Sequence, residues 1–174
     1  MTAGHWPWDI SDDVADKLIG SGITRHAMYC PSSPERDNDD LWNFASNFRV
    51  LGYAMTLTGA ENMWSTNLNP TLDGGQVSVG TNSFAVSPSK RVLLADATLS
   101  IGDNVVQRSE NRYLGIKGGY SDTHPQGWGG LDRTSHLNGS MPAGGNVNML
   151  DGHVEWRAFD QMYPRCLVNP FFWW

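Results

Sequence analysis

The chain has 174 residues, of which 40% are hydrophobic and only 17% are charged. The hydrophobic share suffices for one core, so we expect a single domain over residues 1–174. The formal net charge of −6 and the scattered lysines and arginines argue against a nucleic-acid partner. No apolar run reaches the roughly 18 residues that a membrane span requires. Residues 1–8 lack the basic and apolar regions of an export signal, which leaves the localisation open.

The N-terminal third predicts one short helix and two strands. Ser11 has the residue type of a helix N-cap and is followed by acidic residues, which the helix dipole favours in a first turn. The helix is expected to end at Gly20 or Gly22. Residues 27–31 and 48–57 are rich in residues that favour strands, and a proline ends the first of these segments.

The middle of the chain predicts one buried strand between long loops. Residues 91–95 form an apolar run that ends at Asp96, as in a buried strand. Residues 58–83 are rich in Asn, Thr and Gly and predict strand fragments within loops. Residues 115–145 predict a long glycine-rich loop, and loops of that length in a compact domain are usually functional or mobile.

A C-terminal β-hairpin is the strongest local prediction. The dipeptide Asp151-Gly152 favours a two-residue turn, because such turns need positive φ angles at both central positions. A turn there pairs Met149 with Val154 and Val147 with Trp156 on one apolar face. Together with the other segments, the hairpin predicts an α+β fold with an antiparallel sheet, one or more short helices and long Gly/Asn-rich loops.

Aromatic residues and cysteines offer further expectations. Most of the eight tryptophans are expected in the core, while exposed ones would contact sugars or protein partners, including a second copy of the chain. Residues 1–9 predict an irregular arm, and the apolar tail at 170–174 should dock on the domain or on a partner. Cys30 and Cys166 would form a disulfide only in an oxidising compartment and only if the fold brings them together.

One candidate site is a metal centre formed by His136, Asp151 and His153, with Glu155 as a further ligand. Imidazole and carboxylate ligands suit Zn²⁺, Mn²⁺ or Ca²⁺. His153 and Glu155 lie two residues apart and would share one face of a strand. The alternative is that Asp151 serves the turn and that the other side chains are polar because they face water.

A second candidate site is a pair of catalytic carboxylates. Asp96 could act with Asp151 or Glu155, assisted by His136, as the acid and base or nucleophile of a small glycoside hydrolase. The same aromatic residues could instead serve a carbohydrate-binding module without catalysis. The candidate sugar-stacking side chains are Trp64, Trp128 and Trp156.

The C-terminal region resembles the prepilin-type, or pseudopilin-like, proteins of the type II secretion and type IV pilus superfamily. In that family a His precedes a Gly-Gly-Asn and an Asp-Gly-His hairpin, and here these motifs are His136, residues 144–146 and residues 151–153. Fourteen residues separate His136 from Asp151, more than in the commonest form of the motif. Supporting matches occur at residues 4–9, 28–32, 41–44 and 91–97.

The resemblance covers the globular part of such proteins, without the long N-terminal apolar helix that anchors the precursor and packs the fibre. It implies a structural role in an exported assembly and protein partners rather than a substrate. By analogy with the major pseudopilins, it also favours calcium near the C-terminal end. The leading expectation is therefore a structural or interaction protein, with the glycan hydrolase and the carbohydrate-binding module as alternatives.

Overall fold

A computed structural model describes residues 6–73, 75–79, 81–103, 107–116, 134–166 and 168–174. It has 22% helix and 34% strand, arranged as antiparallel sheets with short helices, which confirms the predicted α+β class. The two α-helices are α1 (Asp12–Gly20) and α2 (Asp39–Trp42). The strands are β1 (Asp9–Ser11), β2 (Phe48–Val50), β3 (Tyr53–Met55), β4 (Gln76–Val79), β5 (Asn82–Ala85), β6 (Val92–Asp96), β7 (Thr98–Ser100), β8 (Leu137–Asn138), β9 (Met141–Pro142), β10 (Gly144–Met149), β11 (Val154–Ala158) and β12 (Phe171–Trp173). Short 3₁₀ helices are η1 (Arg25–Met28), η2 (Pro34–Arg36), η3 (Ser65–Asn67), η4 (Pro88–Lys90), η5 (Arg108–Glu110) and η6 (Phe159–Gln161).

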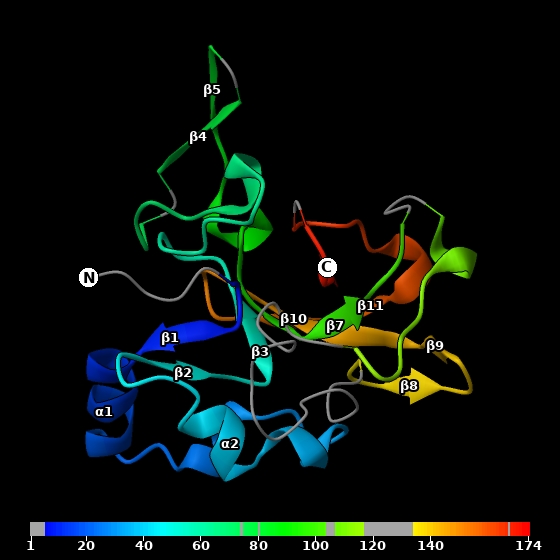
Figure 1. Cartoon of the computed structure of the whole chain (residues 1–174). Coiled ribbons are helices and arrows are strands. Elements are labelled where there is room, and N and C mark those ends of the chain that lie inside the picture. Colours follow the sequence, from blue (N-terminus) through cyan, green and yellow to red (C-terminus); the bar gives the residue numbers. More distant parts are fainter. Residues whose placement is uncertain (1–5, 74, 80, 104–106, 117–133, 167) are drawn as a thin grey trace.

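The largest sheet has the strand order β11-β10-β6-β3, and all its pairs are antiparallel. Two-stranded sheets surround it, and the β4–β5 hairpin projects away from the body of the molecule (Figure 1). The predicted strand at 91–95 is confirmed as β6, which ends at Asp96 opposite Tyr53. Among the described helices none is long and apolar enough to cross a membrane.

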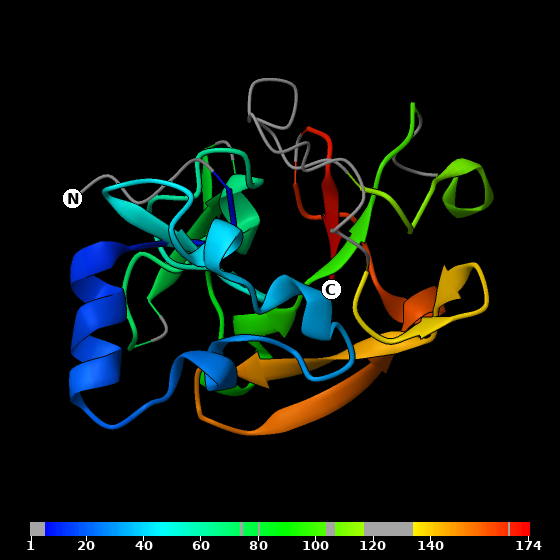
Figure 2. The same cartoon turned by 60° about the horizontal axis from the view of Figure 1, so that its bottom comes forward.

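The predicted N-terminal helix is confirmed as α1, which lies at one side of the molecule (Figure 2). The Ser11 hydroxyl accepts a hydrogen bond from the backbone N–H of Val14 and so caps the helix. Ala15 and Leu18 pack against the core, whereas Val14 and Ile19 are 36% and 40% exposed.

Two strand predictions in the N-terminal third are corrected. Residues 27–31 do not form a strand, since η1 covers their first part and Tyr29 and Cys30 follow as buried extended chain. Residues 48–57 divide into β2 and β3, which belong to different sheets. The division falls at Leu51 and Gly52, where a Cβ atom on Gly52 would lie 2.7 Å from Tyr29 Cα. The close approach of the chain at Tyr29 and at Gly52 interrupts the strand expected in each of the two segments.

The C-terminal hairpin forms where it was predicted, but its turn is one residue longer. Gly152 N–H donates to the Met149 carbonyl at 2.9 Å, and Met149 N–H donates to the His153 carbonyl at 2.9 Å. Gly152 has φ +90°. This three-residue loop is the type that ends in a left-handed glycine and adds a bulge to the hairpin.

The longer turn shifts the predicted register by one residue. Val154 pairs with Asn148, and Trp156 pairs with Asn146. A shift of one residue moves a side chain to the other face of a sheet. Val147 is therefore fully buried in the core, while Val154 and Trp156 remain 61% and 50% exposed on the opposite face.

The aromatic termini close the core. The expected arm at residues 1–9 is not irregular throughout, because Trp6 and Trp8 are buried and β1 starts at Asp9; residues 1–5 lie outside the described part. The Trp8 ring packs edge-on against Phe172 with centroids 5.0 Å apart. The tail docks on the domain, as one of the two expected arrangements, because β12 pairs with β7. Of the predicted loop at 115–145, residues 117–133 lie outside the described part of the chain.

Candidate metal centre

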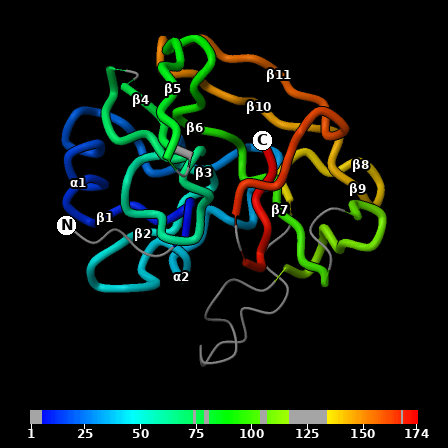
Figure 3. The backbone as a smooth tube through the Cα atoms, turned by 90° about the horizontal axis from the view of Figure 1, so that it is seen from above, coloured from blue at the N-terminus to red at the C-terminus, as the bar shows by residue number. Residues whose placement is uncertain are grey.

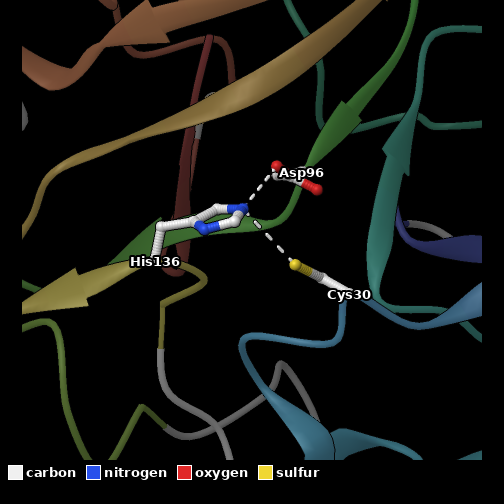
Figure 4. Close-up of side chains that lie close together, drawn as sticks. All are labelled: Cys30, Asp96 and His136. Atoms are coloured by element: carbon white, nitrogen blue, oxygen red, sulfur yellow. Dashed lines mark hydrogen bonds and ion pairs between the residues drawn. The ribbon is translucent and has the colours of Figure 1, made fainter.

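Three potential ligands from distant parts of the sequence meet at one end of the central sheet (Figure 4). Cys30 follows η1, Asp96 ends β6, and His136 immediately precedes β8. One sulfur, oxygen or nitrogen atom of each lies within 4.8 Å of the corresponding atoms of the other two. This is the one group of three or more His, Cys, Asp and Glu ligands found in the described residues.

Asp96 is the centre of the group and is only 4% exposed. Its Oδ2 atom accepts hydrogen bonds from the backbone N–H of Asn146 at 2.6 Å and from the Asn146 side-chain amide at 2.9 Å. The same oxygen lies 2.8 Å from His136 Nε2. Gly145 permits this close approach of β10, because a Cβ atom there would lie 3.2 Å from Asp96 Cβ. The carboxylate is thus fixed by several donors.

His136 is held through its backbone as well as its ring. Its φ angle is +53°, a left-handed conformation that costs a non-glycine residue on the order of 1 kcal/mol. Its backbone N–H donates to the Ser32 hydroxyl at 2.9 Å. The ring stands edge-on against Trp156, with centroids 5.0 Å apart at 83°. These contacts offset the cost of the left-handed backbone conformation, and they hold the imidazole with Nε2 facing Asp96.

Cys30 completes the group from the N-terminal side. Its sulfur lies 3.5 Å from His136 Nε2 and 3.1 Å from the Ser32 hydroxyl, and the residue is 3% exposed. The cysteines at 30 and 166 are both buried and are not joined to each other, so the disulfide considered above is not formed. The sulfur of Cys30 is instead turned toward the imidazole.

The geometry favours ligation over nucleophilic catalysis. In a nucleophile–His–Asp triad the two imidazole nitrogens contact different partners, one the nucleophile and the other the carboxylate. Here the sulfur of Cys30 and the carboxylate of Asp96 both approach Nε2 of His136. One nitrogen cannot both donate its proton to the carboxylate and accept one from the thiol. Three different ligand atoms this close together could hold a metal ion.

The site residues predicted from the sequence fall into two separate groups. His136 and Asp96 lie together in the buried cluster. Asp151 and His153 form an exposed pair at the hairpin tip, with Oδ1 and Nδ1 2.6 Å apart. The hydrogen bond from the backbone N–H of His153 is the main cause that lowers the pKa of Asp151. Glu155 pairs with Arg157 on the outer strand.

The carboxylates considered for glycoside hydrolysis do not face one another. Val92 pairs with Met149, two residues before Asp151 in the hairpin turn. Asp96 lies four residues farther along β6, which is about 13 Å at the usual rise of a strand. Glu155 shares a sheet face with Ala95 through their common partner Val147. Asp96, the next residue, points to the other face.

The candidate sugar-stacking residues are also dispersed. Trp156 is half-exposed beside His136, and Trp64 is partly buried beside η3. Trp128 lies outside the described residues. Among the described residues, Trp156 has its ring contact with His136 and none with Trp64.

Sequence reasoning missed Cys30 as a member of the site, because an apolar strand was expected around it. The signal was present in the segment at 28–32, which carries part of the prepilin-type resemblance. The chain matches no protein-family model, and it has no match among curated proteins or solved structures.

Proposed function

We propose that this chain is a structural, partner-binding domain of the prepilin-like kind, and that it associates with a second copy through strand β11. The observation that carries the proposal is the outward row of β11, where Val154 and Trp156 expose apolar side chains. Among the described residues β11 has one strand neighbour, β10, and it lies at the rim of the molecule (Figure 3). An exposed edge strand with apolar side chains favours pairing with another strand.

The charges of β11 favour a second copy as the partner. In an antiparallel pair of two β11 strands centred on Trp156, Glu155 of one copy would lie opposite Arg157 of the other. Both side chains already form an ion pair within one chain. A two-fold arrangement would therefore place opposite charges across the interface twice, as expected for a self-complementary contact.

The buried cluster supports a structural role for the motifs that carry the resemblance. Asp96, His136 and Asn146 come from three of these motifs, and they contact one another inside the domain. Residues that hold distant segments together in this way serve the architecture. The dispersed carboxylates give the hydrolase alternative no comparable support.

Sedimentation equilibrium over a wide range of protein concentration tests the proposal. We expect a monomer–dimer equilibrium, and the substitution Val154→Lys should weaken it at least about tenfold, because it places a charge opposite Ala158 of the second copy, where the interface would remove it from water. Val154 is 61% exposed, so the substitution should leave folding intact.

The matched control is Phe84→Lys, which places the same charge on an exposed apolar residue of the β4–β5 hairpin. It should leave the equilibrium unchanged. A protein that stays monomeric at all concentrations, or a dimer that Phe84→Lys weakens as strongly, would contradict association through β11.

A further inference from the structure

We propose that Cys30, Asp96 and His136 form a zinc site that ties the N-terminal segment, the central sheet and the segment before β8 together. This site differs from the metal centre expected at the hairpin tip. It shares only His136 with that expectation, and it replaces Asp151 and His153 with a buried thiol and a buried carboxylate. The proposal does not depend on the association of two copies through β11.

One distance between ligand atoms already fits a tetrahedral zinc site, a second is shorter, and the third, from Cys30 Sγ to the Asp96 carboxylate, is at most 4.8 Å. Zinc bonds of about 2.0–2.3 Å in tetrahedral geometry place neighbouring ligand atoms about 3.3–3.7 Å apart. His136 Nε2 and Cys30 Sγ are 3.5 Å apart, within that range. His136 Nε2 and Asp96 Oδ2 are 2.8 Å apart and would separate by about half an ångström as the ion enters.

The chemistry of the three ligands selects zinc among the common ions. A thiolate is a poor ligand for calcium or magnesium, which bind oxygen atoms. Thiolate and imidazole together are typical of zinc. When zinc is bound, the divalent ion would neutralise the thiolate of Cys30 and the carboxylate of Asp96, which are 3% and 4% exposed.

Surrounding residues already orient the ligands as in a metal site. The two N–H groups of Asn146 hold the Asp96 carboxylate, and the Ser32 hydroxyl holds the backbone of His136. Such contacts fix ligand orientation and strengthen metal binding. A water molecule would take the fourth position.

Binding is balanced by the release of one proton. The thiol of Cys30 loses its proton to solvent and binds as thiolate, while the imidazole binds through Nε2 and carries its proton on Nδ1. The His136 side chain is 23% exposed, which gives the ion a route from solvent. Affinity should therefore fall as the pH is lowered.

The experiment is a titration of the metal-stripped protein with Zn²⁺ alone and with Co²⁺ as a spectroscopic substitute. We expect one ion per chain, a thiolate-to-cobalt charge-transfer band, and a melting temperature raised by about 5–10 °C at a hundredfold excess of zinc over the dissociation constant. Alkylation followed by peptide mass mapping in the wild-type chain should show that zinc protects Cys30.

Variants place the ion within the molecule. His136→Ala and Cys30→Ser should abolish stoichiometric binding, whereas the double variant Asp151→Asn/His153→Ala should retain it. The variant Cys166→Ala contains Cys30 as its single cysteine and should keep the charge-transfer band. If a site variant fails to fold, the cobalt spectrum of the wild-type chain and the mapping of the protected cysteine still show whether Cys30 binds the ion.

Three results would overturn the proposal. The first is the absence of stoichiometric binding. The second is binding without a thiolate band, or binding that is lost in the variant Asp151→Asn/His153→Ala. Either result would assign the ion to the hairpin tip. The third is rapid alkylation of Cys30 at neutral pH that zinc does not slow, which would favour a nucleophilic thiol.

Discussion

An aspartate and a histidine meet near each end of the β10–β11 pair, at 2.8 Å and 2.6 Å, but the two pairs differ in burial and in sequence separation. At one end Asp96 and His136 come from distant segments and meet in a buried position. At the other end Asp151 and His153 are neighbours in an exposed turn. The comparison teaches that a His–Asp pair acquires a role from its burial and its partners rather than from its composition.

The largest expected difference between the two ends is in stability. Asp96→Ala should lower the free energy of unfolding by about 3 kcal/mol or more, because it leaves the N–H groups of Asn146 and the imidazole of His136 without their buried acceptor. Asp151→Ala should cause a much smaller loss. Urea denaturation in the presence of a chelator measures both, and equal losses would refute the distinction.

A glycine near the buried end should have the next largest effect. Gly52→Ala should cost about 2 kcal/mol, because the new Cβ atom would meet backbone atoms of Tyr29 and Cys30 that cannot move aside easily. The control is Gly20→Ala at the end of α1, where no atom lies within 4 Å of the added carbon. It should be neutral or slightly stabilising. Thermal unfolding of both variants checks this, and a tolerated Gly52→Ala would show that the Cys30 segment is loosely held.

The difference between the two ends also explains what the sequence could predict. The cap of α1, the strand β6 and the location of the hairpin depend on residues close together in the chain, and these predictions are confirmed. The cluster depends on contacts between residues up to 106 positions apart, such as Cys30 with His136. No local pattern encodes such a distance.

The hairpin register shows the same limit within a few residues. The dipeptide Asp151-Gly152 is compatible with a two-residue or a three-residue loop, and tertiary packing decides between them. The observed register places Trp156 on the face of the sheet that carries Asn146, beside His136. The predicted register would have placed it in the core, so one residue of turn length separates the two arrangements.

At the hairpin tip, replacing the turn glycine Gly152 should have a moderate effect on stability. Gly152→Ala should lower the free energy of unfolding by about 1 kcal/mol, because a φ of +90° is unfavourable for alanine. The loss should be no larger, since no atom lies within 4 Å of the added carbon. Gly152→Asn should cost less, since asparagine tolerates left-handed conformations better. A register change in either variant would appear as altered amide exchange in β11. A loss as large as that of Gly52→Ala would contradict the view that the tip is locally determined.

The smallest expected effect concerns the acid titration of the tip. The pKa of Asp151 lies below the usual value, chiefly because its carboxylate accepts a hydrogen bond from the backbone N–H of His153, with the imidazole as a lesser cause. A depressed pKa means that the folded chain favours the charged carboxylate. Its contribution to stability is therefore present above the ordinary aspartate pKa and is lost as the pH falls through the lowered value. His153→Ala retains the backbone N–H, so the pKa of Asp151 should stay below its ordinary value in a carbon-detected NMR titration. A return of the pKa to its ordinary value in that variant would assign the effect to the imidazole, and would show that the exposed pair depends on its side chains as the buried pair does.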